Sequence, residues 1–306
     1  MRSNTNQETI IGRIYQHNLQ SRTVANNTSP NFGKTFINGT LDVATDDNLL
    51  NVITIHYTYV TETTKAGGAN PTYAALNKII NEGKTIVTDG KDGAWKVRCT
   101  PAIALNDFYP QGKTDLVSQP RHEGGFVSII TELPEEKARN SFRTDVLITG
   151  TNRAEDNSYL TIKGAIFNFK NDILPFSFIV RNPDGMNYFE NLGASPTEPV
   201  YTQVWGHIES TTVVVSSSTE SAFGEAAVDT SERRIRNWVV TGAKVENYDF
   251  GDESVMTAED VTKALQNRNV MLAEVKKRSD DYYASRATTN TAPAASAPIP
   301  TGGFNF

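Results

Sequence analysis

Hydrophobic runs and polar breaks follow one another in the same order twice along the chain, about 125 residues apart. In the first copy, an apolar run at 36–43 is followed by a polar break and a second run at 52–60. In the second copy, the two runs lie at 161–168 and 176–180. Each copy predicts a strand with an internal glycine, a tight turn and a returning strand. The repeat therefore indicates two domains built on one plan.

A short helix is predicted after the strand pair in each half. The first helix lies near 72–80, where Pro71 precedes it and Gly83 ends it. The second is only a turn or two, at 186–192, and stops at Gly193. Proline at the first position and glycine just past the last are the expected boundary residues of a helix.

Further strands complete each half. Residues 200–208 align with 95–103, which places Val204 on Cys99 and Ile208 on Ile103. The first half would close with strands near 126–131 and 143–149, and the second with residues 238–240. This order of elements is typical of a small five-stranded barrel. We therefore predict a mainly β protein with two tandem barrels.

Composition divides the chain into five parts. A polar N-terminal segment is expected to be flexible, apart from a possible short leading strand at its apolar patch, 10–15. A threonine cap and an acidic first turn predict a helix near the C-terminus. The last residues, rich in Thr, Ala, Pro and Ser, predict a disordered tail with an aromatic tip. The predicted parts are a flexible segment at 1–30, barrels at 31–150 and 158–250, a helix at 257–286 and a tail at 287–306.

The net charge of the 306-residue chain is −6, which argues against a uniformly basic surface but allows a local basic groove. Its single cysteine, Cys99, excludes an internal disulfide. No apolar run has the length of a signal-peptide core or a membrane span. We therefore expect a cytoplasmic protein.

Motifs for catalysis or cofactors are missing from the sequence. Three Gly-Lys-Thr triplets occur, but a phosphate-binding loop needs a glycine five positions earlier, where Thr28, Lys78 and Asp107 stand. The four histidines are far apart and none has a Cys or carboxylate at metal-ligand spacing. The sequence predicts no enzyme, no cofactor and no metal.

Basic and aromatic residues alternate in the last strand of the second half. Arg234, Arg236 and Trp238 share one face because strand side chains alternate with a period of two, and Arg233 is adjacent. Two cations beside an indole would hold phosphates and stack a base. The equally weighted alternative is an edge strand whose arginines cover a half-buried tryptophan.

The candidate DNA-binding residues in the first half are also basic and aromatic. Lys96 and Arg98 share the outer face of one strand, and a loop after it carries Phe108, Tyr109 and Lys113. Exposed aromatics in a loop suggest base stacking. Tyr57 and Tyr59 end another strand, and packing is the expected role for at least one of them.

These features together resemble the oligonucleotide-binding (OB) barrel of single-stranded DNA-binding proteins. The flexible linker ending in Gly-Gly-Phe-Asn-Phe is similar to the tails by which such proteins recruit replication and repair partners. The resemblance implies OB-like barrels, binding of single-stranded DNA in replication, recombination or repair, and partner contacts at Phe304 and Phe306. A bacteriophage is the preferred source, and the expected location is then the host cytoplasm. Two barrels, and no acidic residue after Asp281, depart from the bacterial pattern.

Two other classes of protein remain as alternatives. A non-catalytic structural β-protein of a virion would suit the Asn/Thr-rich surface and the negative charge. A binding module for RNA or carbohydrate is the second, since OB barrels serve both.

Overall fold

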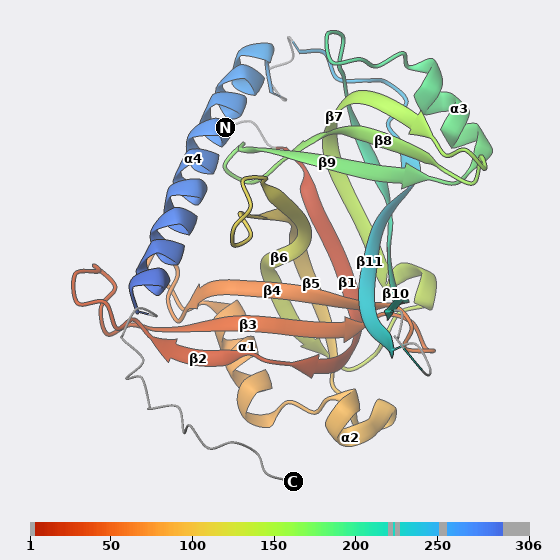
Figure 1. The fold of residues 1–306 in the computed structure, drawn as a ribbon. Coiled ribbons are helices and arrows are strands. Elements are labelled where there is room, and N and C mark those ends of the chain that lie inside the picture. The colour runs from red at the N-terminus through yellow and green to blue at the C-terminus, as the bar shows by residue number, and fades with distance from the viewer. Residues whose placement is uncertain (1–3, 220–222, 224–226, 251–255, 290–306) are drawn as a thin grey trace.

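The computed structural model describes residues 4–219, 223, 227–250 and 256–289. Its strands form one continuous sheet of 11 strands that closes on itself twice, giving two barrels (Figure 1). The first barrel is the lower one in this view and the second lies above it.

The first barrel is a closed ring of five strands. The ring runs β1–β3–β4–β6–β5 and back to β1, with β4 and β6 parallel and every other pair antiparallel. A short strand, β2, extends the sheet at β3, and two helices lie between β4 and β5. The elements are β1 (Asn6–His17), β2 (Gln20–Thr23), β3 (Thr35–Ala44), β4 (Val52–Thr61), α1 (Pro71–Glu82), α2 (Ile86–Gly93), β5 (Lys96–Phe108) and β6 (Val117–Ile130).

The second barrel repeats this ring strand for strand. It runs β7–β8–β9–β11–β10 and back to β7, again with one parallel pair, between β9 and β11. A helix again separates the third strand from the fourth. The elements are the 3-10 helix η1 (Glu136–Ala138), then β7 (Asn140–Arg153), β8 (Leu160–Phe167), β9 (Ile173–Val180), α3 (Pro183–Asn191), β10 (Val200–Thr219) and β11 (Ala227–Ala243). The predicted fold class, two OB-like barrels, is confirmed.

The glycine in each copy of the repeat marks a point where two backbones meet. A Cβ atom on Gly164 would lie 2.2 Å from the carbonyl oxygen of Leu147, and one on Gly39 would lie 2.6 Å from that of Asn18. Gly39 also has a φ of +129°, a conformation that other residues rarely adopt. The second strand of each barrel therefore needs glycine where it coils against the chain segment beside it.

The predicted helices are confirmed. In α1, Pro71 occupies the first turn, Asn70 caps the helix by accepting from the N–H of Thr72, and the N–H of Gly83 donates to Ile79 at the other end. Leu76 and Ile79 are fully buried and belong to the main core cluster. The helix thus begins and ends where its boundary residues predicted.

The boundaries of the barrels differ from the predicted ones. Within the expected flexible segment, 1–30, β1 forms the first strand of the first barrel. The strand near 143–149 is β7, which opens the second barrel instead of closing the first. The reason is non-local: Asn6 to Ile10 of β1 pair with Thr144 to Asn140 of β7, so one strand serves both barrels.

A buried polar cluster joins the barrels behind this pairing. The Nε1 of Trp238 on β11 donates to the carboxyl group of Glu8 on β1 at 2.7 Å, and the Nδ1 of His122 on β6 lies 2.8 Å from its other oxygen. Glu8 and His122 are fully buried, and Trp238 is 2% exposed. The main hydrophobic cluster likewise continues through both barrels. The two barrels are therefore packed as one body.

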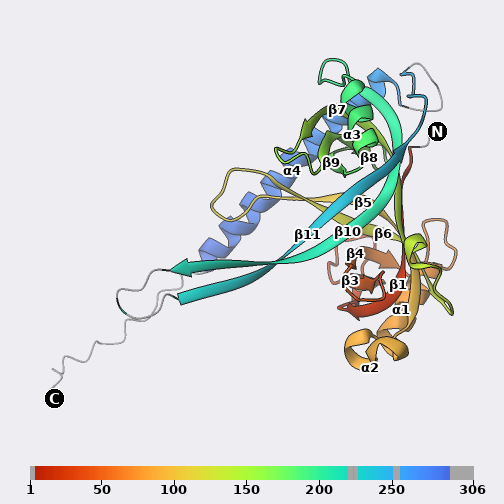
Figure 2. The same ribbon diagram turned by 90° about the vertical axis from the view of Figure 1, so that its right-hand side faces the viewer.

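Two long elements extend from these barrels. β10 and β11 continue as a two-stranded arm, paired as far as Thr219 and Ala227 (Figure 2). The helix α4 (Ala258–Thr289) runs from the second barrel to the first along the left-hand side of Figure 1. Its Arg268 pairs with Asp107 of β5 at 3.2 Å, and both side chains are almost fully buried.

The predicted C-terminal helix is thus confirmed. Its cap is reciprocal, because the Oγ1 of Thr257 accepts from the N–H of Asp260 and the Asp260 carboxylate accepts from the N–H of Thr257. Of the predicted tail, residues 290–306 lie outside the described residues. Among the helices that the structure does describe, none is long and apolar enough to cross a membrane.

Candidate nucleic-acid interface

A groove runs between the two barrels. Its walls come from β5 and β6 of the first barrel and from β7, β8, β9 and β11 of the second, and its volume is about 430 Å³. We call it the inter-barrel groove; its lining includes Ser118, Pro120, Lys163, Ser177, Ile179 and Arg236. On the second-barrel side, the groove therefore includes β8 and β9, the second and third strands of that barrel.

Strand alternation explains which side chains reach the groove. Along β9, Leu174, Phe176 and Phe178 point into the core, while Ser177 and Ile179 point outward. Phe176 still forms part of the floor of the groove. The surface offered to a ligand is thus polar and cationic, above an aromatic base.

Arginines from both barrels act on one histidine of the first barrel. Burial lowers the pKa of His56 on β4, and the positive charges of Arg121 on β6 and Arg236 on β11 lower it further. Arg121 is held along its strand by Glu123, whose carboxylate lies 2.8 Å away and also accepts from the hydroxyl of Thr58. Arginines from different barrels therefore act on one imidazole, which favours an anion at this point.

An aromatic pair lies on the second and third strands of the first barrel. The rings of Phe36 on β3 and Tyr59 on β4 have centroids 4.6 Å apart, and Tyr59 is 44% exposed. A second exposed ring, Phe169, lies in the turn between β8 and β9 with the ammonium group of Lys170 over it. Exposed rings beside cations can stack unpaired bases.

The prediction for Trp238 is wrong, and the packing alternative holds. Its ring contacts Phe176 and His122 at centroid distances of 4.9 and 5.0 Å inside the protein. Arg236 and Trp238 share a strand face and both border the groove, but the Trp238 ring is only 2% exposed and belongs to the core cluster. The indole therefore faces Glu8, not solvent.

The other arginines of this strand lie farther along the arm. Arg233 and Arg234 pair through their backbones with Val213 and Thr212, and their side chains lie outside what the structure describes. Their role in DNA binding stays a prediction, whereas Arg236 lines the groove.

The two tyrosines of β4 have different environments. Tyr57 is 2% exposed in the core, where burial raises its pKa well above the ordinary value. It therefore cannot stack on a ligand, and the prediction for it is wrong. Tyr59 is accessible, as the prediction for it requires.

The remaining first-barrel candidates do not converge on the groove. The ammonium group of Lys96 donates to the carbonyl of Thr131, and Arg98 is exposed on the same face of β5. The strand β5 pairs with β1 and β6, and not with β3 or β4. Their contribution to binding stays a prediction.

The loop candidates lie beside α4. Lys276 of α4 lies over the ring of Tyr109, and Ser279 donates to the carbonyl of Tyr109 at 3.2 Å. Phe108 is half-buried at the end of β5, and Lys113 is exposed in the loop. The helix thus anchors this loop and covers part of the surface predicted for stacking.

Sequence reasoning missed His56, Arg121 and Lys163 as site residues. Lys163 precedes the repeat glycine Gly164, and this position within the motif was an available signal. His56 and Arg121 are brought together only by the parallel pairing of β4 with β6, in which His56 lies opposite Glu123. That pairing has no local signature in the sequence.

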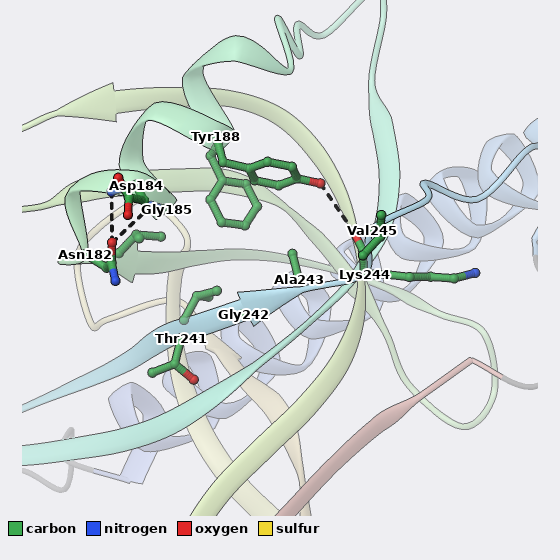
Figure 3. Close-up of a pocket in the computed structure, with 12 residues that line it drawn as sticks. Asn182, Asp184, Gly185, Tyr188, Thr241, Gly242, Ala243, Lys244 and Val245 are labelled. Carbon is green, nitrogen blue, oxygen red and sulfur yellow. Dashed lines mark hydrogen bonds between the residues drawn. The ribbon is translucent and has the colours of Figure 1, made fainter.

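A separate cavity of about 390 Å³ lies between α3 and the end of β11 (Figure 3). It is lined mainly by apolar side chains and backbone, and the hydroxyl of Tyr188 donates to the carbonyl of Lys244 at 3.3 Å. The Lys244 side chain points away from α3 (Figure 3), with its ammonium group over Tyr248. This cavity is not suited to a polyanion. No cluster of metal-ligating side chains occurs among the described residues.

The strand order and the groove define a class of protein: two OB-like barrels in tandem, with a groove between them. The chain belongs to the YorF family, whose sequence profile matches residues 6–278. A search of curated proteins found no match.

Two solved structures with a similar fold are of the single-stranded DNA-binding protein from Thermus aquaticus. A deletion and substitution variant shares 11% identity at a TM-score of 0.46, covering 82% of this chain and 98% of the other. The wild-type protein shares 9% at 0.45, covering 80% and 95%.

Proposed function

We propose that this protein binds single-stranded DNA along the inter-barrel groove without catalysing a reaction. The observation that carries the proposal is a groove between the barrels lined by two cations of the second barrel, Lys163 and Arg236, with Arg121 of the first barrel following the lining residue Pro120. OB barrels bind extended oligomers on the face of their second and third strands. Here those strands are β8 and β9 in the second barrel, which line the groove, and β3 and β4 in the first barrel, which contribute no residue to its lining.

The chemistry of the groove suits phosphates and bases. Three cations, Arg121, Arg236 and Lys163, would release about three counterions, so log K should fall with log salt at a slope of about −2 for a single strand. A DNA strand that continued from the groove onto β3 and β4 would also stack on the Phe36 and Tyr59 rings, adding about 1–3 kcal/mol per base. The affinity should therefore be moderate per site and sensitive to salt.

The more specific assignments rest on the resemblance of the barrels and the tail. We propose a role in replication, recombination or repair, with Phe304 and Phe306 recruiting a protein partner. Both residues lie outside the described part of the chain. Expression from a bacteriophage in the host cytoplasm belongs to the same proposal.

The test is a fluorescence-anisotropy titration of a labelled single strand of mixed sequence at two salt concentrations, with duplex DNA and RNA as competitors. Arg236→Ala should weaken binding about tenfold, the loss expected for a charge-assisted phosphate contact. Lys263→Ala, which removes an exposed cation from α4, is the matched control and should leave the affinity unchanged.

No binding at low salt would refute the proposal. Concentration-dependent self-assembly in light scattering would then favour the structural, virion-type alternative. Stronger competition by RNA than by single-stranded DNA would instead reassign the groove to RNA.

A further inference from the structure

A second cavity lies on the other face of the sheet where the barrels join. Along β1, Glu8 and Ile10 point inward, so Gln7 and Thr9 point to the opposite face. Along β7, Phe142 is buried and Arg143 is exposed. We call this cavity the junction pocket; it has a volume of about 570 Å³, and its lining includes Gln7, Thr9, Lys137, Arg143, Trp205 and His207.

An indole lies at the surface of this pocket. Trp205 on β10 is 36% exposed, although the neighbouring inward residues Val204 and Ile208 are fully buried. A Cβ atom on Gly242 would lie 2.5 Å from the Nε1 of Trp205, so the ring lies directly against the β11 backbone. The guanidinium group of Arg143 lies 5.8 Å from the ring centroid. An added flat ring could extend this arrangement over the exposed indole or the guanidinium plane.

The charge of the pocket is opposite to that of the whole protein. Lys137 and Arg143 line it, and no carboxylate does among the described residues, although the Nε2 of His207, which also lines it, lies 3.2 Å from the Glu209 carboxylate. Arg143 has no carboxylate partner in the described part of the chain. Lys137 pairs with Glu135, but both side chains are at least three-quarters exposed, and such pairs contribute little. Two cations can therefore turn to an incoming anion.

We propose that the junction pocket binds a nucleotide unit, with the base against Trp205 and Arg143 and the phosphate held by Arg143 and Lys137. The unit could belong to a DNA strand that continues past the groove, or it could be a free nucleotide. As a site for a strand segment the pocket rests on the proposed function; as a site for a free nucleotide it does not.

The experiment compares two oligothymidylates and one mononucleotide on the full chain. An oligomer of roughly 8 nucleotides is the least that two barrels would occupy, and one of roughly 40 exceeds the most. Thymidine 5′-monophosphate tests the free nucleotide through tryptophan fluorescence. The variants are Arg143→Ala and Trp205→Phe for the pocket and Lys163→Ala for the groove, each checked for an unchanged thermal unfolding transition.

For a strand segment, Arg143→Ala should weaken binding of the long oligomer about tenfold and leave the short one unchanged. Lys163→Ala should weaken both. For a free nucleotide, the mononucleotide should quench the wild-type protein and lose this effect in Trp205→Phe. The inference is overturned if folded Arg143→Ala and Trp205→Phe bind all three ligands as the wild type does. Failure of the proposed function is a different result, in which the wild type binds neither oligomer.

Discussion

Replacing Trp238 by phenylalanine should destabilise the protein, and the size of the effect follows from its surroundings. The substitution removes the N–H that Trp238 donates to Glu8 and leaves a fully buried carboxyl oxygen without that partner. An unsatisfied buried polar group costs about 1–3 kcal/mol. The smaller ring also leaves a space beside Phe176 and His122, so we expect a loss of about 2–4 kcal/mol in the free energy of unfolding.

Urea denaturation followed by circular dichroism measures this loss as a lower midpoint with an unchanged m-value. Trp205→Phe is the matched control, because Trp205 is partly exposed and outside the core cluster, and it should change the free energy by less than about 1 kcal/mol. If Trp238→Phe unfolded like the wild type but lost affinity for single-stranded DNA, Trp238 would be a binding residue and the packing argument would be refuted.

Three other predictions concern the helix, the groove and the tail. Arg268→Ala should leave the buried Asp107 carboxylate unpaired, destabilise α4 by about 3–5 kcal/mol and increase its hydrogen exchange; exchange as slow as in the wild type would contradict this. The pKa of His56 is lowered in the free protein and a bound phosphate would raise it, so affinity should rise as the pH falls from about 7 to about 5.5. His56→Gln should flatten this pH profile in anisotropy titrations, and an unchanged profile would exclude His56. Deleting residues 304–306 should preserve the affinity for DNA and abolish partner capture, whereas retained capture would remove the tail from the proposal.

The parts of the fold that the sequence predicted are those with local signatures. Pro71 and Gly83 bounded a helix correctly, and the repeat glycines located the second strand of each barrel. The first strand, β1, is longer than the sequence predicted, because its apolar core is short and polar residues precede it. β1 is stabilised by pairing with β3, β5 and β7, and none of these contacts is visible in its own residues.

For the candidate site, even less could be predicted from local sequence signatures than for the fold. A period of two correctly placed Arg236 and Trp238 on one strand face, and both border the groove, yet Arg236 is only partly buried whereas the Trp238 ring is packed in the core. The contact that decides between them is with Glu8, 230 residues away along the chain. Local alternation can therefore assign a face to a side chain, but only the path of the strand through the barrels decides what that face meets.

Because the two barrels share one sheet, they would hold a DNA strand differently from two domains on a flexible linker. Domains on a flexible linker gain affinity through a high effective concentration, which depends on linker length. Here β1 pairs with β7, and a core cluster runs through both barrels, so no flexible linker separates the faces proposed to bind DNA. The strands that carry Arg121 and Arg236 are held together by the buried contacts of His122 and Trp238 with Glu8. A strand that follows this groove would meet a preformed track, and the ordering cost on binding would fall mainly on the DNA.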